Sequence, residues 1–298
     1  MSATEVQAAP PAPVPAAPAP APARRARSRG FASIRWEIVG PLSLYLVFTL
    51  VPFYWMVVFA FRKTGSTAPV PWPITFDNFN TVWNGIGFRI FFQNSVIVGV
   101  GSLVFGTLVA VTGGYAMARY KFRGKQVFML SLLGTQFIPG AMMLIPLFVI
   151  FKHIHVLNTL WSLVIADTVF HLPLSLILMS GFIRNIPVEL EEASWVDGCS
   201  RLRGFFAVVL PMLRPALVAV GAFAFIGSWN NFLFALMFIN DQSKFTIPVG
   251  LSYTLGEYNV DFGALAAGGV VAAVPVVIVF GIIQRYLVKG LSAGAVKG

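Results

Sequence analysis

Six long apolar stretches constrain the fold of this chain more than any other feature of its sequence. Each is long enough to cross about 30 Å of hydrocarbon, which takes a helix of about 20 residues. The sequence therefore predicts an all-α, polytopic membrane protein with six transmembrane helices. The six stretches are residues 38–61, 90–117, 128–151, 161–182, 216–239 and 262–287.

The composition agrees with a membrane location. The chain has 57% hydrophobic and 11% charged residues, and its mean hydropathy is +0.79, which is too apolar for a soluble domain of 298 residues. The net charge of +10 is then explained by topology and by contact with anionic lipid, and nucleic-acid binding is the weaker explanation.

The distribution of Lys and Arg predicts the orientation of the chain, because positively charged loops stay in the cytoplasm. With both termini inside, the inner segments hold sixteen of the 21 Lys and Arg residues. We therefore expect residues 118–126 and 184–214 inside, and residues 63–88, 152–159 and 239–261 outside. The remaining cationic residues, on the outer side, are Arg62, Lys63, Arg89, Lys152 and Lys244.

Residues 1–35 differ from the rest of the sequence. They form an Ala/Pro-rich run followed by a basic cluster from Arg24 to Arg29. Such a composition builds no packed core, so we expect a disordered cytoplasmic tail with no cleaved signal peptide. Residues 36–298 then form the membrane domain.

An acidic segment, residues 186–198, separates two apolar stretches and carries four carboxylates. Pro187 suits the first position of a helix, and glutamates in the first turn are favoured by the helix dipole. Gly198 is expected to end the helix. The segment predicts a short acidic helix that docks on another protein; the alternative is an ordinary solvated loop helix.

The pattern that follows this segment is specific. Glu192-Ala193 precedes Asp197-Gly198, and Leu210-Pro211 comes later. It closely resembles the EAA loop, E-A-A-x-x-D-G-A followed by I-x-L-P, of the inner-membrane subunits of binding-protein-dependent ABC importers. Ser194 and Cys199 replace two alanines of that pattern, and both are small.

Further segments extend the resemblance to the carbohydrate branch of these importers, and within it to the maltose-type, MalG-like permeases. Residues 145–147 and 155–159 resemble I-P-L-y with a later G-L-l-N-T. Residues 227–236 resemble W-N-x-F-l-x-p-L, and residues 289–298 resemble the k-G-l-t-a-G-A-V-K-G tail.

The resemblance implies a permease subunit that forms half of a sugar pore. Its implied partners are a second permease subunit, two ATP-binding subunits and an extracytoplasmic sugar-binding protein. This chain has no G-x-x-x-x-G-K-[ST] phosphate loop, so ATP and Mg are expected on the partner ATPase, and no catalytic or metal site is expected here. The residues assigned to the ATPase contact are Glu189, Glu191, Glu192, Ala193, Ser194, Asp197 and Gly198.

A polar group in the predicted fifth span is the candidate substrate pathway. Asn230 and Asn231 carry amides that suit sugar hydroxyls, and the indole of Trp229 suits the apolar face of a pyranose ring. Polar side chains inside a membrane are costly unless they are paired. The alternative interpretation is that these asparagines hold helices together.

Asp167 and His171 are four residues apart and share a helix face. As a proton relay they would support the alternative function, a stand-alone secondary transporter. The other interpretation is a mutually satisfied pair. His153 and His155 lack a third ligand residue nearby, so no metal site is expected, and the lone Cys199 forms no internal disulfide.

Overall fold

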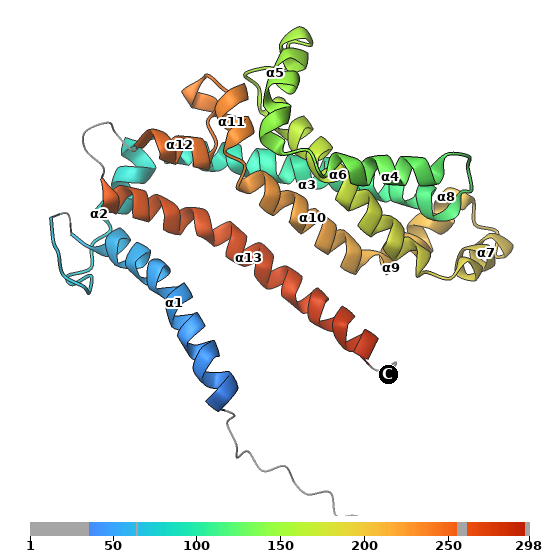
Figure 1. The fold of residues 1–298 in the computed structure, drawn as a ribbon, viewed down its shortest axis with the longest axis horizontal. Helices are drawn as coiled ribbons and strands as arrows, with labels where there is room; N and C mark the ends of the chain where they lie inside the picture. Colours follow the sequence, from blue (N-terminus) through green and yellow to red (C-terminus); the bar gives the residue numbers. More distant parts are fainter. Residues whose placement is uncertain (1–35, 64, 255–260, 296–298) are drawn as a thin grey trace, which may run out of the picture. The chain divides into compact units, whose positions relative to one another are not determined.

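The structure is a computed structural model that describes residues 36–63, 65–254 and 261–295, and every regular element in these ranges is helical. The chain divides into two compact units, residues 1–49 and 50–298. The predicted tail, residues 1–35, lies outside the described residues. Figure 1 shows the helices, which are α1 (Trp36–Phe61), α2 (Asp77–Asn80), η1 (Thr81–Gly85), α3 (Phe88–Arg119), α4 (Lys125–Thr135), η2 (Gly140–Met143), α5 (Leu144–His153), α6 (Leu160–Arg184), α7 (Val188–Val196), α8 (Arg201–Gly204), η3 (Phe205–Val209), α9 (Leu210–Met212), α10 (Arg214–Trp229), α11 (Leu233–Phe238), η4 (Gln242–Lys244), α12 (Ile247–Thr254) and α13 (Phe262–Ala295).

Four helices in the described part of the chain, α1, α3, α6 and α13, are long and apolar enough to cross a membrane. They match four of the six predicted spans. The count reaches six only if each of two bent helix pairs forms one span. The angles are 100° between 125–135 and 140–153, and 75° between 201–212 and 214–229.

The prediction of a continuous third span over 128–151 is wrong. Helix α4 ends at Thr135, and the chain resumes helical structure at Gly140. Pro139 lies in this break with φ −59° and ψ 135°. Proline has no backbone N–H and disfavours helical geometry in the residue before it, so the break has a local cause.

The predicted fifth span, 216–239, is also not a single helix. Helix α10 starts at Arg214 and ends at Trp229, and the short α11 begins at Leu233. The side-chain Oδ1 of Asn231 accepts a hydrogen bond of 3.1 Å from the backbone N–H of Phe234, in the first turn of α11. A side chain therefore satisfies a backbone N–H at this break between the two helices.

The core of residues 50–298 forms where α3 packs along α6 and α10, which lie side by side in Figure 1. Small residues permit this close approach. A Cβ at Gly114 of α3 would lie 2.9 Å from Met179 of α6, and one at Gly99 would lie 2.8 Å from the ring of Phe225 of α10. Apolar side chains on the outer sides of these helices stay exposed, as suits contact with lipid.

Hydrogen bonds pair the predicted outer segments with one another and the predicted inner segments with one another. Asn158 accepts from the backbone N–H groups of Asn240 and Asp241, at 3.2 and 3.1 Å. Arg119, the last residue of α3, donates hydrogen bonds to Glu191 and to the carbonyl of Ile186. Each set of contacts thus joins segments that were predicted to lie on the same side of the membrane, and the sidedness itself stays a prediction.

Candidate functional site

The predicted acidic helix is present as α7. Its N-cap is Pro187, and Glu189 and Glu191 lie in its first turn, where the helix dipole favours carboxylates. Gly198 follows the helix with φ 87°, and its N–H donates to Trp195 O at 3.0 Å. Glycine adopts this left-handed conformation without steric cost, so the predicted helix end is confirmed.

The exposure of the predicted coupling residues divides them into two groups. Glu189, Glu192, Ala193, Asp197 and Gly198 are exposed. Glu191 and Ser194 are buried, with Glu191 only 2% exposed. The expectation that all the glutamates present exposed charge is therefore wrong for Glu191.

Glu191 is buried because it is fully paired with α3. Arg119 donates from Nε to Glu191 Oε1 at 2.6 Å, and its Nη2 lies 2.6 Å from the same oxygen. Tyr115 donates its hydroxyl to Oε2 at 2.7 Å, and Arg119 Nη2 also donates to Ile186 O at 2.9 Å. A buried charge is tolerated only when it is paired in this way.

Arg119 and Tyr115 carry no motif that marks them as functional residues. Arg119 is one of the predicted inner positive charges, and its partner lies 72 positions away. No local pattern marks such a pair. The signal that was present is the combination of a basic residue ending one span with an acidic segment after a later span.

A second contact attaches α7 to α8. Ser194 donates its hydroxyl to Glu191 O at 2.7 Å, and Gly204 of α8 lies against it, where a Cβ would stand only 2.6 Å from Ser194 Oγ. Arg201 lies over the ring of Trp195, 5.3 Å from its centroid. One face of α7 is therefore fixed to the protein.

The opposite face of α7 is exposed and carries both charge and apolar area. Glu189 and Glu192 lie on it with Ala193, and Val196 is 87% exposed. This face is therefore accessible to another protein.

The three residues of the predicted pathway group have separate environments. Trp229 is 4% exposed, donates from Nε1 to Ala272 O at 3.1 Å, and stacks on Phe225. Asn231 donates its amide to the carboxylate of Asp167. Asn230 is exposed and bonds to Ile226 O in its own helix at 2.9 Å.

A cavity of about 590 Å³ lies beside α10, α12 and α13. Trp229 and Asn230 line it, together with apolar side chains such as Ile247 and Val276. Asn231 is not among the lining residues because it is turned toward α6. Asn230 is thus the asparagine of the predicted group that lines this cavity.

The predicted pairing of Asp167 with His171 is not present in the structure. Each side chain instead contacts a residue in or just after α10. Asp167 is buried and pairs with Asn231. His171 lies against Gly227, and its ring meets the ring of Phe223 edge-on at 5.6 Å. The predicted shared helix face is present, but its two members have separate partners.

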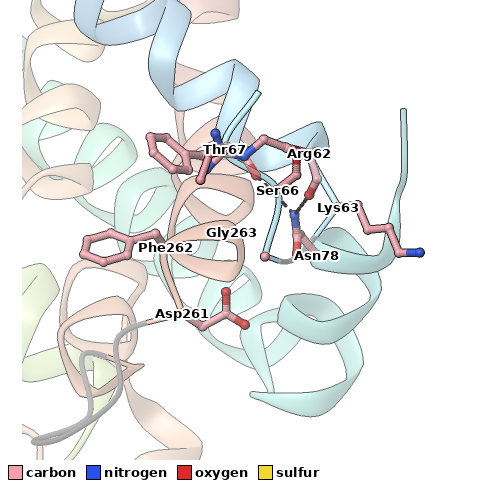
Figure 2. Close-up of a pocket in the computed structure, with 10 residues that line it drawn as sticks. Arg62, Lys63, Ser66, Thr67, Asn78, Asp261, Phe262 and Gly263 are labelled. Atoms are coloured by element: carbon pink, nitrogen blue, oxygen red, sulfur yellow. Dashed lines mark hydrogen bonds between the residues drawn. The ribbon is translucent and has the colours of Figure 1, made fainter. Parts of the chain in front are cut away.

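A cavity of about 480 Å³ lies among the predicted outer segments (Figure 2). Asn78 donates its amide to the carbonyls of Phe59, Ala60 and Arg62, at 3.1, 3.0 and 2.9 Å. These bonds satisfy carbonyls at the end of α1 that have no helical partner. Asp261, on the other side of the cavity, caps α13 by accepting from Ala264 N at 3.0 Å.

Comparison with known proteins identifies the class of this chain. The family described as "Binding-protein-dependent transport system inner membrane component" matches residues 102–293. The chain belongs to this family, so it is a pore component of an importer, and the sequence-based recognition of a carbohydrate importer permease is confirmed.

Three curated relatives match nearly the whole chain. The probable ABC transporter permease protein YurM of Bacillus subtilis is 34% identical, over 86% of this chain and 87% of its own length. The diacetylchitobiose uptake system permease protein DasC of Streptomyces coelicolor is 35% identical, over 88% and 97%. The trehalose/maltose transport system permease protein MalG of Thermococcus litoralis is 31% identical, over 88% and 96%.

A solved structure supports the fold. It is a bacterial ABC transporter involved in the import of the acidic polysaccharide alginate, and its matched chain gives a TM-score of 0.72 at 23% identity, over 86% of this chain and 99% of that chain. The predicted all-α permease fold is therefore confirmed. These comparisons give no support to the alternative of a proton-coupled transporter that works alone.

Proposed function

We propose that this chain forms half of the translocation pore of an ATP-driven sugar importer in the bacterial plasma membrane, with both termini in the cytoplasm. A second permease subunit supplies the other half. Two ATPase subunits bind ATP and Mg, and an extracytoplasmic binding protein delivers the sugar. The observation that carries this proposal is helix α7, whose one face is fixed to the membrane helices while its other face exposes Glu189, Glu192 and Ala193.

The position of α7, with one face bonded to the protein and the other exposed, suits a helix that a partner subunit displaces. Closure of the ATPase pair on ATP displaces α7, and α7 displaces the helices to which it is bonded. The pore then alternates between two packings, of which ATP binding favours one. Glu192 supplies a charged contact, and Ala193 beside it leaves room for close approach.

The relatives suggest the chemical class of the substrate. Their names include diacetylchitobiose, trehalose/maltose and arabinooligosaccharides. We propose a disaccharide or a short oligosaccharide, with Asn230 as the amide that contacts it. Trp229 and Asn231 then shape the pathway, since both are less exposed than Asn230 and each bonds to another helix. Asn230, by contrast, bonds to Ile226 O of the adjoining α10.

The test is purification of the tagged chain from its own organism, with identification of the co-purified subunits. Uptake of labelled diacetylchitobiose, maltose and trehalose is measured in cells that lack the natural permease. The charge reversal Glu192→Lys is expected to abolish uptake and release the ATPase. Asp77→Lys, an exposed charge reversal at the start of α2, is the matched control and should leave both unchanged.

Absence of an ATPase from the purified complex would contradict the proposal. So would uptake that continues after ATP is depleted. A Glu192→Lys variant with normal uptake and normal ATPase retention would remove α7 from the coupling contact.

A further inference from the structure

Among the described residues, Glu191 is the only acidic side chain of α7 that is buried. It contacts Arg119, the last residue of α3. The side chains are 3% and 11% exposed, so neither is available to a partner protein. Glu191 nevertheless lies between Glu189 and Glu192, which are exposed. The same helix therefore presents charge outward and is anchored inward at one position.

The anchor is built to resist displacement in more than one direction. Both oxygens of Glu191 are occupied, one by Arg119 and the other by Tyr115. Arg119 also holds Ile186 O, just before α7 begins. Arginine presents its donors in a fixed, planar fork, so the contact sets the orientation of α7 as well as its distance from α3.

Helix α3 is the element best placed to distribute such a displacement. It runs from Phe88 to Arg119 and packs along both α6 and α10. The small residues at its contacts leave little slack, because Gly114 lies against Met179 and Gly99 against Phe225. A close-packed helix transmits a shift at its end to its neighbours.

We propose that the Glu191–Arg119 pair is the link through which a displacement of α7 reaches the membrane helices, and that Glu191 is a positioning residue instead of an ATPase contact. The inference rests on the proposed function, in which an ATPase moves α7. It separates two events: binding of the ATPase, which uses the exposed face of α7, and transmission of its motion, which uses the buried link. Loss of the link uncouples a complex that remains assembled.

The experiment compares Glu191→Gln with Asp77→Asn in the complete complex, reconstituted with its ATPase and binding protein. Each substitution converts one carboxylate into its amide, but Asp77 is exposed and lies at the start of α2, away from α7. The measurements are the amount of ATPase retained, the rate of ATP hydrolysis, and the import of whichever of maltose, trehalose and diacetylchitobiose the wild-type complex transports. Glu191→Gln should retain the ATPase and import about tenfold or more less sugar per ATP hydrolysed, whereas Asp77→Asn should match the wild type.

A charge swap distinguishes transmission from simple loss of a side chain. The double variant Arg119→Glu with Glu191→Arg restores opposite charges across the contact, so its import per ATP should exceed that of Arg119→Glu alone. Should Glu191→Gln fail to insert, Arg119→Lys takes its place, because it keeps the charge pair and removes the planar fork. That variant should lower import per ATP about threefold.

Unchanged import per ATP in Glu191→Gln, or in Arg119→Lys where that variant replaces it, overturns the proposal. Release of the ATPase by Glu191→Gln, as expected for Glu192→Lys, also overturns it, because Glu191 would then act at the docking contact. Failure of the proposed function is recognised separately. In that case the wild-type complex itself lacks an ATPase or imports no sugar on addition of ATP.

Discussion

Replacing Gly198 by valine should perturb the end of α7 through backbone energy alone. Gly198 has φ 87°, and nothing lies within 4 Å of the point where a Cβ would stand, so no clash contributes. A side chain in this left-handed region costs about 1–2 kcal/mol, and a β-branched residue is the least tolerant. A cost of this size changes the equilibrium between the formed and the opened turn by about 5–30-fold.

The assay is a substitution series at Gly198, read by sugar uptake and by ATPase retention at equal expression. Asparagine tolerates the left-handed region best, so the expected order of activity is Gly, Asn, Ala and then Val. Gly181 is the matched control, because it also has open space around it but has no positive φ. Gly181→Val should leave coupling intact.

Two results would refute this reasoning. Normal uptake and ATPase stimulation in Gly198→Val would show that the turn does not set the docking geometry. Equal losses in Gly198→Val and Gly181→Val would show that the loss has a cause other than the left-handed backbone.

Three further outcomes are expected. In intact cells without Cys199, an impermeant thiol reagent should label single cysteines placed in residues 66–77 and should not label one at Glu192; labelling at Glu192 from outside would contradict the six-span topology. Asn230→Ala should weaken transport by roughly 1 kcal/mol, about fivefold, with the ATPase still attached, and unchanged transport kinetics would assign the amide to helix packing. Gly263→Ala should lower thermal stability, because its Cβ would stand 2.7 Å from Oδ1 of the buried Asn78, and an unchanged melting temperature would show that this end of the molecule relaxes freely.

The long helices were predictable because the length of an apolar stretch directly reflects the thickness of a bilayer. The breaks in the third and fifth spans were not, since average hydropathy does not register single residues. At the first break Pro139 lacks a backbone N–H. At the second break the side chain of Asn231 accepts a hydrogen bond from the backbone N–H of Phe234. The turn at Gly198 was predictable because a left-handed residue after a helix is a local requirement.

Helix α7 contains a residue whose environment the sequence alone does not predict. Charge density located α7 and its ends, and the exposure of Glu189 and Glu192 agrees with it. The same charge density cannot separate Glu191 from its neighbours, because its burial depends on Arg119 and Tyr115 of a distant helix. Residues that look equivalent in a short segment are distinguished only by tertiary contacts.

The Trp229–Asn231 group illustrates the same limit within the membrane. An amide suits a sugar hydroxyl and another buried polar group equally well, so the sequence leaves both roles open. In the structure the side-chain amide of Asn231 donates a hydrogen bond to the carboxylate of Asp167, and its Oδ1 accepts one from the backbone N–H of Phe234 in α11. Both bonds lie at the point where the fifth apolar stretch breaks. Trp229 is held by Ala272 O. All three side chains thus have a structural partner, since Asn230 bonds to Ile226 O. Asn230 differs from the other two in being exposed beside the cavity, so it stays the candidate for contact with the sugar.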